Sequence, residues 1–260
     1  MSALFEARGI TKHFGGLTAL HDVTFRIDGG IASIIGPNGA GKTTLFNIFT
    51  GLYPPDQGEV TFKGQPLVGL RPDQITALGV CRTFQNIRLF ANMTAAENVL
   101  VGMHARVRLR VWDVLSRNGR FRDAEHALWR RAGALLRRVG LHTKANEIAR
   151  NLPYGDQRRL ELARALASDP SLLLLDEPTA GMTQGEAVTL MTLLRGLVNE
   201  LGLAIILIEH NMRVVMEVSD RVTVLDHGEK IAEGSPREVQ TNARVVEAYL
   251  GRRAAARAGA

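Results

Sequence analysis

A glycine-rich segment constrains this chain more than any other feature of its sequence. Residues 36–44 read Gly-Pro-Asn-Gly-Ala-Gly-Lys-Thr-Thr and directly follow the apolar run at residues 31–35. Two glycines that enclose four residues, followed by lysine and a hydroxyl residue, allow the backbone N–H groups to point inward at phosphates. The helix that follows adds its positive end to the same site. The segment therefore predicts a strand, a phosphate-binding loop and a helix, in that order.

The side chains of this loop have separate expected roles. Lys42 would reach the β- and γ-phosphates of a nucleoside triphosphate, and the Thr43 hydroxyl would bind Mg²⁺. A glycine-rich turn that binds nothing is the alternative interpretation. The predicted nucleotide contacts in the loop are Gly36, Pro37, Asn38, Gly39, Ala40, Gly41, Lys42, Thr43 and Thr44.

The length of the chain, 260 residues with 45% hydrophobic content, is enough for one large domain or two unequal lobes. Its longest apolar runs, such as residues 203–208, are far shorter than the roughly 20 residues that cross a bilayer, and no signal peptide opens the chain. We therefore expect a cytoplasmic chain that reaches a membrane only through a partner. The single cysteine, Cys81, lies in an apolar stretch and is expected to be a core residue.

The net charge of +6 comes mainly from arginines, many of them at residues 106–138 and at Arg252, Arg253 and Arg257 near the end of the chain. Such runs form either a solvated face or a surface that lies near anionic lipid head groups. Nucleic acid is not an expected partner, because aromatic residues that could stack on bases make up only 5% of the chain.

Hydrophobic periodicity divides the chain into parts. Val23, Phe25 and Ile27 alternate with polar residues, which predicts an antiparallel β lobe in the first sixty residues. Residues 94–149 have helical patterns without strand signals. The apolar runs at 172–175 and 204–208 are typical of buried parallel strands.

These patterns predict an α/β fold in which a phosphate-loop core sheet carries an antiparallel β lobe and an inserted helical subdomain. Helices are expected at 155–167 and 186–201, and two short strands and two helices at 221–250. We expect a single domain over residues 1–260. Its predicted parts are the nucleotide-binding core and β lobe at 1–85 and 150–250, the helical subdomain at 86–149, and a basic tail at 251–260.

The strand predicted at 172–175 ends in two adjacent carboxylates, Asp176 and Glu177. Phosphoryl transfer needs such groups opposite a phosphate loop. Asp176 would hold Mg²⁺, directly or through water, and Glu177 would polarise the attacking water. Taken alone, a strand that ends in Asp-Glu is a weak signal, but it gains weight after a phosphate loop in the same chain.

Together these motifs resemble those of the ATP-binding-cassette (ABC) ATPases. Phe84-Gln85 is similar to the glutamine loop of that family, and Glu209-His210 to its switch histidine. Phe14 matches the aromatic residue on which adenine stacks. Residues 152–157 stand where the signature sequence belongs. Taken individually, these residues have simpler interpretations: Gln85 as a surface amide, His210 as an ordinary strand-end histidine, and Phe14 equally as a core residue.

The resemblance implies that two cassettes meet head to tail and bind MgATP between them. The signature residues Leu152, Pro153, Tyr154, Gly155 and Asp156 would then complete the nucleotide site of the opposite cassette. Lys42, Gln85, Glu177 and His210 are the implied catalytic residues. Thr43, Gln85 and Asp176 are the implied ligands of Mg²⁺.

The chain departs from the family pattern at two places. Pro153 and Tyr154 replace the usual Ser and Gly, so a hydroxyl contact to the opposing γ-phosphate is missing. Thr183 and Gln184 replace the usual acidic or amide residue after the catalytic Glu. A heteromeric partner would then supply the fuller set.

Within the family, the chain most resembles the larger ATPase subunit of importers for branched-chain amino acids. The similar phrases lie at residues 14–20, 82–86, 152–159, 177–181, 209–212 and 248–251, and the basic stretch at 104–121 resembles the lengthened helical region of that branch. This branch implies a smaller paralogous ATPase as partner, with a homodimer as the alternative. It also implies two integral membrane permease subunits, an indirect periplasmic solute-binding protein, and a place at the cytoplasmic face of the inner membrane.

Three other functions stay open. One is a non-transport cassette ATPase acting in DNA repair or on the ribosome, although the chain lacks the long coiled coil of the first and the second cassette of the latter. Another is an exporter ATPase, because the membrane partners set the direction of transport. The third, a regulatory module without turnover, fits poorly with the presence of both Glu177 and His210.

Overall fold

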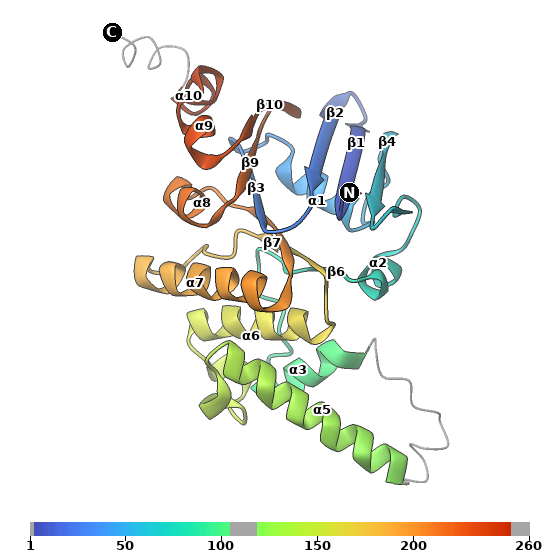
Figure 1. Ribbon diagram of the computed structural model, residues 1–260, viewed down its shortest axis with the longest axis vertical. Coiled ribbons are helices and arrows are strands. Elements are labelled where there is room, and N and C mark those ends of the chain that lie inside the picture. The colour runs from blue at the N-terminus through green and yellow to red at the C-terminus, as the bar shows by residue number, and fades with distance from the viewer. Residues whose placement is uncertain (1–2, 105–118, 251–260) are drawn as a thin grey trace.

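A computed structural model of the protein describes residues 3–104 and 119–250. Two β-sheets and a set of helices make up the fold (Figure 1). The basic segment at 105–118 and the predicted basic tail at 251–260 lie outside the described residues.

The predicted antiparallel lobe is present as a four-stranded sheet in the order β2-β1-β4-β5. Its strands are β1 (Phe5–Phe14), β2 (Leu17–Ile27), β4 (Gln57–Phe62) and β5 (Gln65–Pro66). Val23, Phe25 and Ile27 are buried while the residues between them are exposed, as their alternation predicts.

The central sheet has six strands in the order β10-β9-β3-β8-β7-β6. They are β3 (Ile31–Ile35), β6 (Val80–Arg82), β7 (Leu172–Asp176), β8 (Ala204–Ile208), β9 (Arg221–Asp226) and β10 (Glu229–Gly234). All neighbours pair in parallel except β9 and β10. Strand β6 was not predicted, because three residues are too few for a periodic signal.

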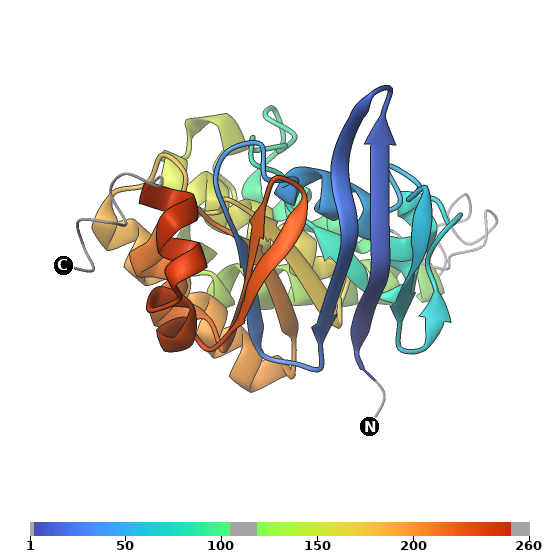
Figure 2. The ribbon, with the colours of Figure 1, turned by 90° about the horizontal axis from the view of Figure 1, so that it is seen from above.

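The central sheet separates two hydrophobic cores. Leu173 and Leu175 of β7 pack with the helices on one face, whereas Leu172 and Leu174 pack with the aromatic residues of α1 (Lys42–Phe49) and of the β lobe. Alternate residues of a strand point to opposite faces, so an entirely apolar strand is buried on both sides. The phosphate loop lies at the end of β3, where the central sheet and the β lobe meet at α1 (Figure 2).

The long helices cover one face of the central sheet. Helices α6 (Tyr154–Ala167) and α7 (Gln184–Leu201) lie next to it, and α3 (Ala95–Met103) and α5 (Gly119–Arg138) pack beyond α6 (Figure 1). The shorter helices are α2 (Pro72–Leu78), α8 (Met212–Val218), α9 (Pro236–Gln240) and α10 (Ala243–Leu250), with 3-10 turns at His142–Lys144 and Ala149–Asn151. None of the helices in the described ranges is long and apolar enough to cross a membrane.

Two predicted helix starts shift by one or two residues. Helix α6 begins at Tyr154, one residue before the prediction, and α7 begins at Gln184, two residues before it. Thr183 accepts a hydrogen bond from the backbone N–H of Glu186, whose side chain bonds back to Thr183. This capping box explains Thr183 as the start signal of α7. The division of the chain into a core and a helical subdomain at 86–149 stays a prediction.

Candidate functional site

Backbone geometry explains the glycines of the phosphate loop. A Cβ on Gly36 would lie 2.0 Å from the carbonyl oxygen of Leu225, and one on Gly41 would lie 2.7 Å from that of Ala19. Gly41, with φ 95°, also forms the left-handed N-cap of α1. Only glycine fits both positions, so the chain can turn from the end of β3 into α1 within six residues.

Lys42 reaches back over this loop. Its Nζ donates hydrogen bonds to the carbonyl oxygens of Gly36 and Pro37, at 2.8 and 2.9 Å. Burial lowers the pKa of the Lys42 ammonium, and the nearby carboxylates of Glu177 and Asp176 act against this shift. A buried cation held only by neutral carbonyls and neighbouring carboxylates is well suited to bind the oxygens of a phosphate.

A cavity of about 630 Å³ lies between the phosphate loop, the turn from β1 to β2, and Glu177. We call it the inner cavity. It brings together many residues that the sequence predicted as nucleotide contacts or catalytic groups. Those that line it are Phe14, Asn38, Gly39, Ala40, Gly41, Lys42, Thr43, Thr44 and Glu177. Phe14 is 42% exposed, its ring makes an edge contact with Tyr53 at 5.5 Å, and the Nζ atom of Lys12 lies 5.6 Å from the ring centre. This exposure is compatible with the predicted stacking on adenine.

The cavity is also lined by four residues that were not predicted as site residues: Leu17, Thr18, Ala19 and His227. His227 occupies the turn between β9 and β10 with φ 46°, and its side chain is 96% exposed. The phrase Asp226-His227-Gly228 is a turn signal, but no local pattern says that the turn lies beside the phosphate loop.

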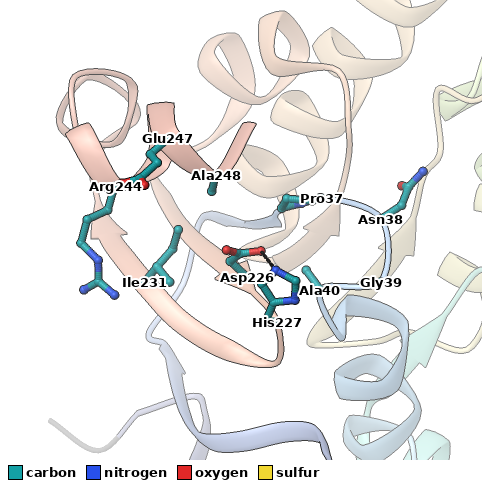
Figure 3. A pocket seen from close by; sticks show the side chains of 10 residues that line it. All are labelled: Pro37, Asn38, Gly39, Ala40, Asp226, His227, Ile231, Arg244, Glu247 and Ala248. Carbon is teal, nitrogen blue, oxygen red and sulfur yellow. Dashed lines mark ion pairs between the residues drawn. The ribbon is translucent and has the colours of Figure 1, made fainter. Parts of the chain in front are cut away.

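A second hollow of about 750 Å³ lies on the outer side of the loop (Figure 3). It is lined by residues 37–40, by Asp226 and His227, whose Oδ1 and Nε2 atoms lie 3.8 Å apart, and by Arg244, Glu247 and Ala248 of α10. Neither Lys42, Thr43 nor Glu177 lines it. The inner cavity is therefore the better candidate for the nucleotide site.

Three predicted catalytic residues meet at the end of β7. The Nε2 atom of Gln85 donates to Oε2 of Glu177 at 2.8 Å, and Nδ1 of His210 lies 3.7 Å from the same oxygen. Glu177 has the left-handed φ of 46°, and its N–H donates to the carbonyl of Ile208 at the end of β8. This turn aims the carboxylate at the cavity, while Asp176 stays in the strand.

Asp176 has a partner that the sequence did not predict. Nη2 of Arg82, at the end of β6, donates to Oδ2 of Asp176 at 2.8 Å, and both side chains are over 90% buried. The Arg82 guanidinium lies 5.4 and 5.2 Å from the ring centres of Phe46 and Phe84, and it donates to Asn47 of α1. Arg82 thus links the phosphate-loop helix to the carboxylate predicted to bind the metal.

The predicted ligands of Mg²⁺ form a chemically suitable set. The hydroxyl of Thr43, the amide oxygen of Gln85 and the carboxylate of Asp176 are all hard oxygen ligands. Within residues 3–104 and 119–250, no group of three or more His, Cys, Asp or Glu side chains could hold a metal. Magnesium at this place would therefore take its other ligands from phosphate oxygens and water, as it does in other nucleotide sites.

The predicted signature residues lie apart from the inner cavity, since none of them lines it. Pro153 is the N-cap of α6 and Leu152 is buried. Asp156 is buried and forms ion pairs with Lys144 and Arg159 of its own chain. The positive end of α6 lies here, so the loop keeps the property that would attract a phosphate from outside.

Known proteins resemble the chain in sequence. A family model described as ABC transporter matches residues 20–180, and one described as branched-chain amino acid ATP-binding cassette transporter matches residues 229–255. A relative from Salmonella typhimurium, the high-affinity branched-chain amino acid transport ATP-binding protein LivG, is 44% identical over 249 residues. These residues cover 95% of this chain and 98% of the relative.

Solved structures resemble it in fold. A nucleotide-free ATP-binding cassette from an ABC transporter superposes with a TM-score of 0.83 at 29% identity, over 96% of this chain and 100% of the other. A dimeric ATP-binding cassette in a post-hydrolysis state, bound to ADP and Pi, has a TM-score of 0.75 at 29% identity, over 90% and 99% of the two chains. Sequence and fold agree with the resemblance drawn from the motifs: this chain belongs to the ABC transporter family of ATP-binding proteins.

Proposed function

We propose that this chain is the ATP-hydrolysing subunit of an importer for branched-chain amino acids or closely related small solutes. The contact between Gln85 and Glu177 at the rim of the phosphate-loop cavity carries the catalytic part of the proposal. The likeness to LivG over 95% of the chain supports the transport part. An assignment to DNA repair, the ribosome or export has no comparable support.

In the proposed reaction, Lys42 leaves the carbonyls of Gly36 and Pro37 and binds the β- and γ-phosphates of ATP. Glu177 accepts a proton from the water that attacks the γ-phosphorus, the bond from that phosphorus to the bridging oxygen of the β-phosphate breaks, and ADP and inorganic phosphate leave. Gln85 holds the Glu177 carboxylate in place through its amide, and His210 approaches the γ-phosphate from the end of β8. Mg²⁺ held by Thr43, Gln85 and Asp176 would neutralise charge on the phosphates.

The signature residues at 152–156 are proposed to act on a second cassette. They do not line the cavity of their own chain, which leaves the start of α6 available to a nucleotide bound elsewhere. A solved relative is dimeric with ADP and Pi bound. Closed dimers would contact the γ-phosphate and open ones would not, so hydrolysis would reverse closure.

The proposed assembly contains a smaller paralogous cassette, two integral membrane permeases and, indirectly, a periplasmic solute-binding protein. The chain would lie on the cytoplasmic face of the inner membrane, held there by the permeases. Pairing of two copies of this chain is the alternative that the test below distinguishes.

Co-purification of the tagged chain from its native membranes tests the proposal. We expect mass spectrometry to find two polytopic subunits and a second cassette, and the eluate to hydrolyse ATP. Leucine uptake into vesicles reconstituted with that eluate and the proposed solute-binding protein then tests which solute is transported. Recovery of ribosomes, of DNA-bound proteins or of the chain alone would contradict the transport assignment and leave the ATPase chemistry intact.

A further inference from the structure

Tyr154 and Arg158 join three functional loops of the chain through hydrogen bonds. Both residues lie in the first two turns of α6. The Tyr154 hydroxyl donates to the carbonyl of Ala180 at 2.9 Å and accepts from Nη2 of Arg158 at 3.0 Å. The guanidinium of Arg158 also lies 5.5 Å from the centre of the Tyr154 ring. The tyrosine thus anchors the head of the arginine to the loop that follows Glu177.

The same guanidinium holds the glutamine loop. Nη1 of Arg158 donates to the carbonyl of Phe84 at 2.9 Å, and Nη2 donates to the carbonyl of Gln85. Its side chain is 4% exposed, and it pairs with buried Glu161, which accepts the N–H of Arg88. A buried charged donor that binds two adjacent carbonyls fixes the backbone on both sides of Gln85.

These contacts close into a ring through the catalytic carboxylate. Gln85 donates to Glu177 at 2.8 Å, and the N–H of Ala180 donates to the carbonyl of Glu177 at 3.1 Å. Gly181 makes room for the tyrosine, because a Cβ there would lie 3.2 Å from the Tyr154 ring in a backbone with φ 76°. Each member of the ring is therefore fixed by at least two others.

We propose that Tyr154 and Arg158 are positioning residues that transmit the placement of the signature loop to Gln85 in the same chain, and through it to Glu177. This inference rests on the proposed pairing of cassettes, in which the signature loop meets the nucleotide of the opposite subunit. A nucleotide bound there would fix the start of α6 and, through this ring, the catalytic carboxylate of the other site. Tyr154, which stands where the family usually has glycine, would thus give the two sites a route of communication.

The variant Tyr154→Phe removes the hydroxyl and keeps the ring, so the fold should survive. We measure ATP hydrolysis by the complex that co-purifies with the variant chain. Its kcat should fall about fivefold, which corresponds to about 1 kcal/mol, while the KM for MgATP stays within about twofold. Thr192→Ala is the matched control, because it also removes a hydroxyl that donates to a backbone carbonyl at 2.9 Å, on an exposed face of α7. Its kcat should equal that of the unaltered chain.

A double-mutant cycle with Gln85→Ala separates positioning from a purely structural role. If Tyr154 acts through Gln85, the effect of Tyr154→Phe on kcat should shrink to less than about 1.5-fold in the Gln85→Ala background. The inference would be overturned if Tyr154→Phe lowered kcat equally in both backgrounds. It would also be overturned if Tyr154→Phe alone left kcat unchanged, with or without a raised KM. Failure of the proposed function would instead appear as missing permeases or a missing second cassette in the co-purification.

Discussion

The phosphate loop and the signature loop reach order by different means. The first is specified within a short stretch of sequence, because the positive φ angles of Gly36 (150°) and Gly41 (95°) favour glycine at both positions. The second is held from a distance: Tyr154 contacts Ala180, and Arg158 contacts Phe84 and Gln85, more than 20 residues away in sequence. A loop specified locally can be recognised by its motif. The sequence of a loop held by distant contacts can vary, provided that the residues it contacts vary with it.

The largest expected effect concerns the proposed catalytic base beside the phosphate loop. Glu177→Gln should lower kcat about 10²- to 10⁴-fold, because the amide cannot accept the proton of the attacking water. Binding of MgATP should persist, since Lys42 and the loop N–H groups are unchanged. Steady-state ATPase assays and equilibrium binding of a fluorescent ATP analogue check both parts. Glu217→Gln, at an exposed position of α8, is the isosteric control. Unimpaired hydrolysis by Glu177→Gln would refute Glu177 as the base.

Glycine-to-alanine substitutions compare the two loops directly. Gly36→Ala would place a methyl group against the backbone carbonyl of Leu225, with φ at 150°, and should cost about 3 kcal/mol. Gly155→Ala meets only side-chain atoms of Glu186, the nearest at 2.7 Å, so Glu186 must shift within its capping box with Thr183. Because alanine also favours a helix more than glycine does, the net cost should be less than about 1 kcal/mol. The midpoints of thermal unfolding would then differ by about 4 °C or more. Equal midpoints would remove the contrast between the loops.

The smallest expected effect lies on the surface next to the glutamine loop. Arg88 is exposed, and its guanidinium lies 4.0 Å from the centre of the Phe84 ring. If this surface contacts the membrane subunit, Arg88→Glu should lower solute uptake about fivefold by reversing a charge at the contact. Basal ATP turnover should stay within about twofold. Arg26→Glu, on the antiparallel lobe, serves as the charge-reversal control. Normal uptake by reconstituted Arg88→Glu vesicles would exclude this surface as the contact.

The sequence predicted those parts of the fold that depend on local patterns. The apolar strands β7 and β8, the alternating strand β2 and the glycines of the phosphate loop each have a signal within a few residues. The order of the motifs also placed Gln85, Glu177 and His210 in one proposed site, and the structure brings their side chains together.

Contacts between distant segments could not be predicted. Arg82 was noted only as part of a phrase, because its pairing with Asp176 depends on β6, a strand of three residues. The place of His227 beside the phosphate loop depends on the packing of the β9–β10 turn. Tyr154 was predicted only as a nucleotide contact of the opposite cassette, and the hydrogen bond from its hydroxyl to Ala180 of its own chain was missed. In each case the sequence offers the residue and the tertiary structure supplies its partner.

The central claim is that two cassettes share each hydrolytic site, the phosphate loop of one facing the signature loop of the other. Size-exclusion chromatography with light scattering on the Glu177→Gln protein tests it most directly, after purification from the native membranes and removal of the proposed permeases. With MgATP, the account predicts a particle with the mass of two cassettes that retains nucleotide through the column. A particle with the mass of one cassette that retains MgATP equally well would contradict it.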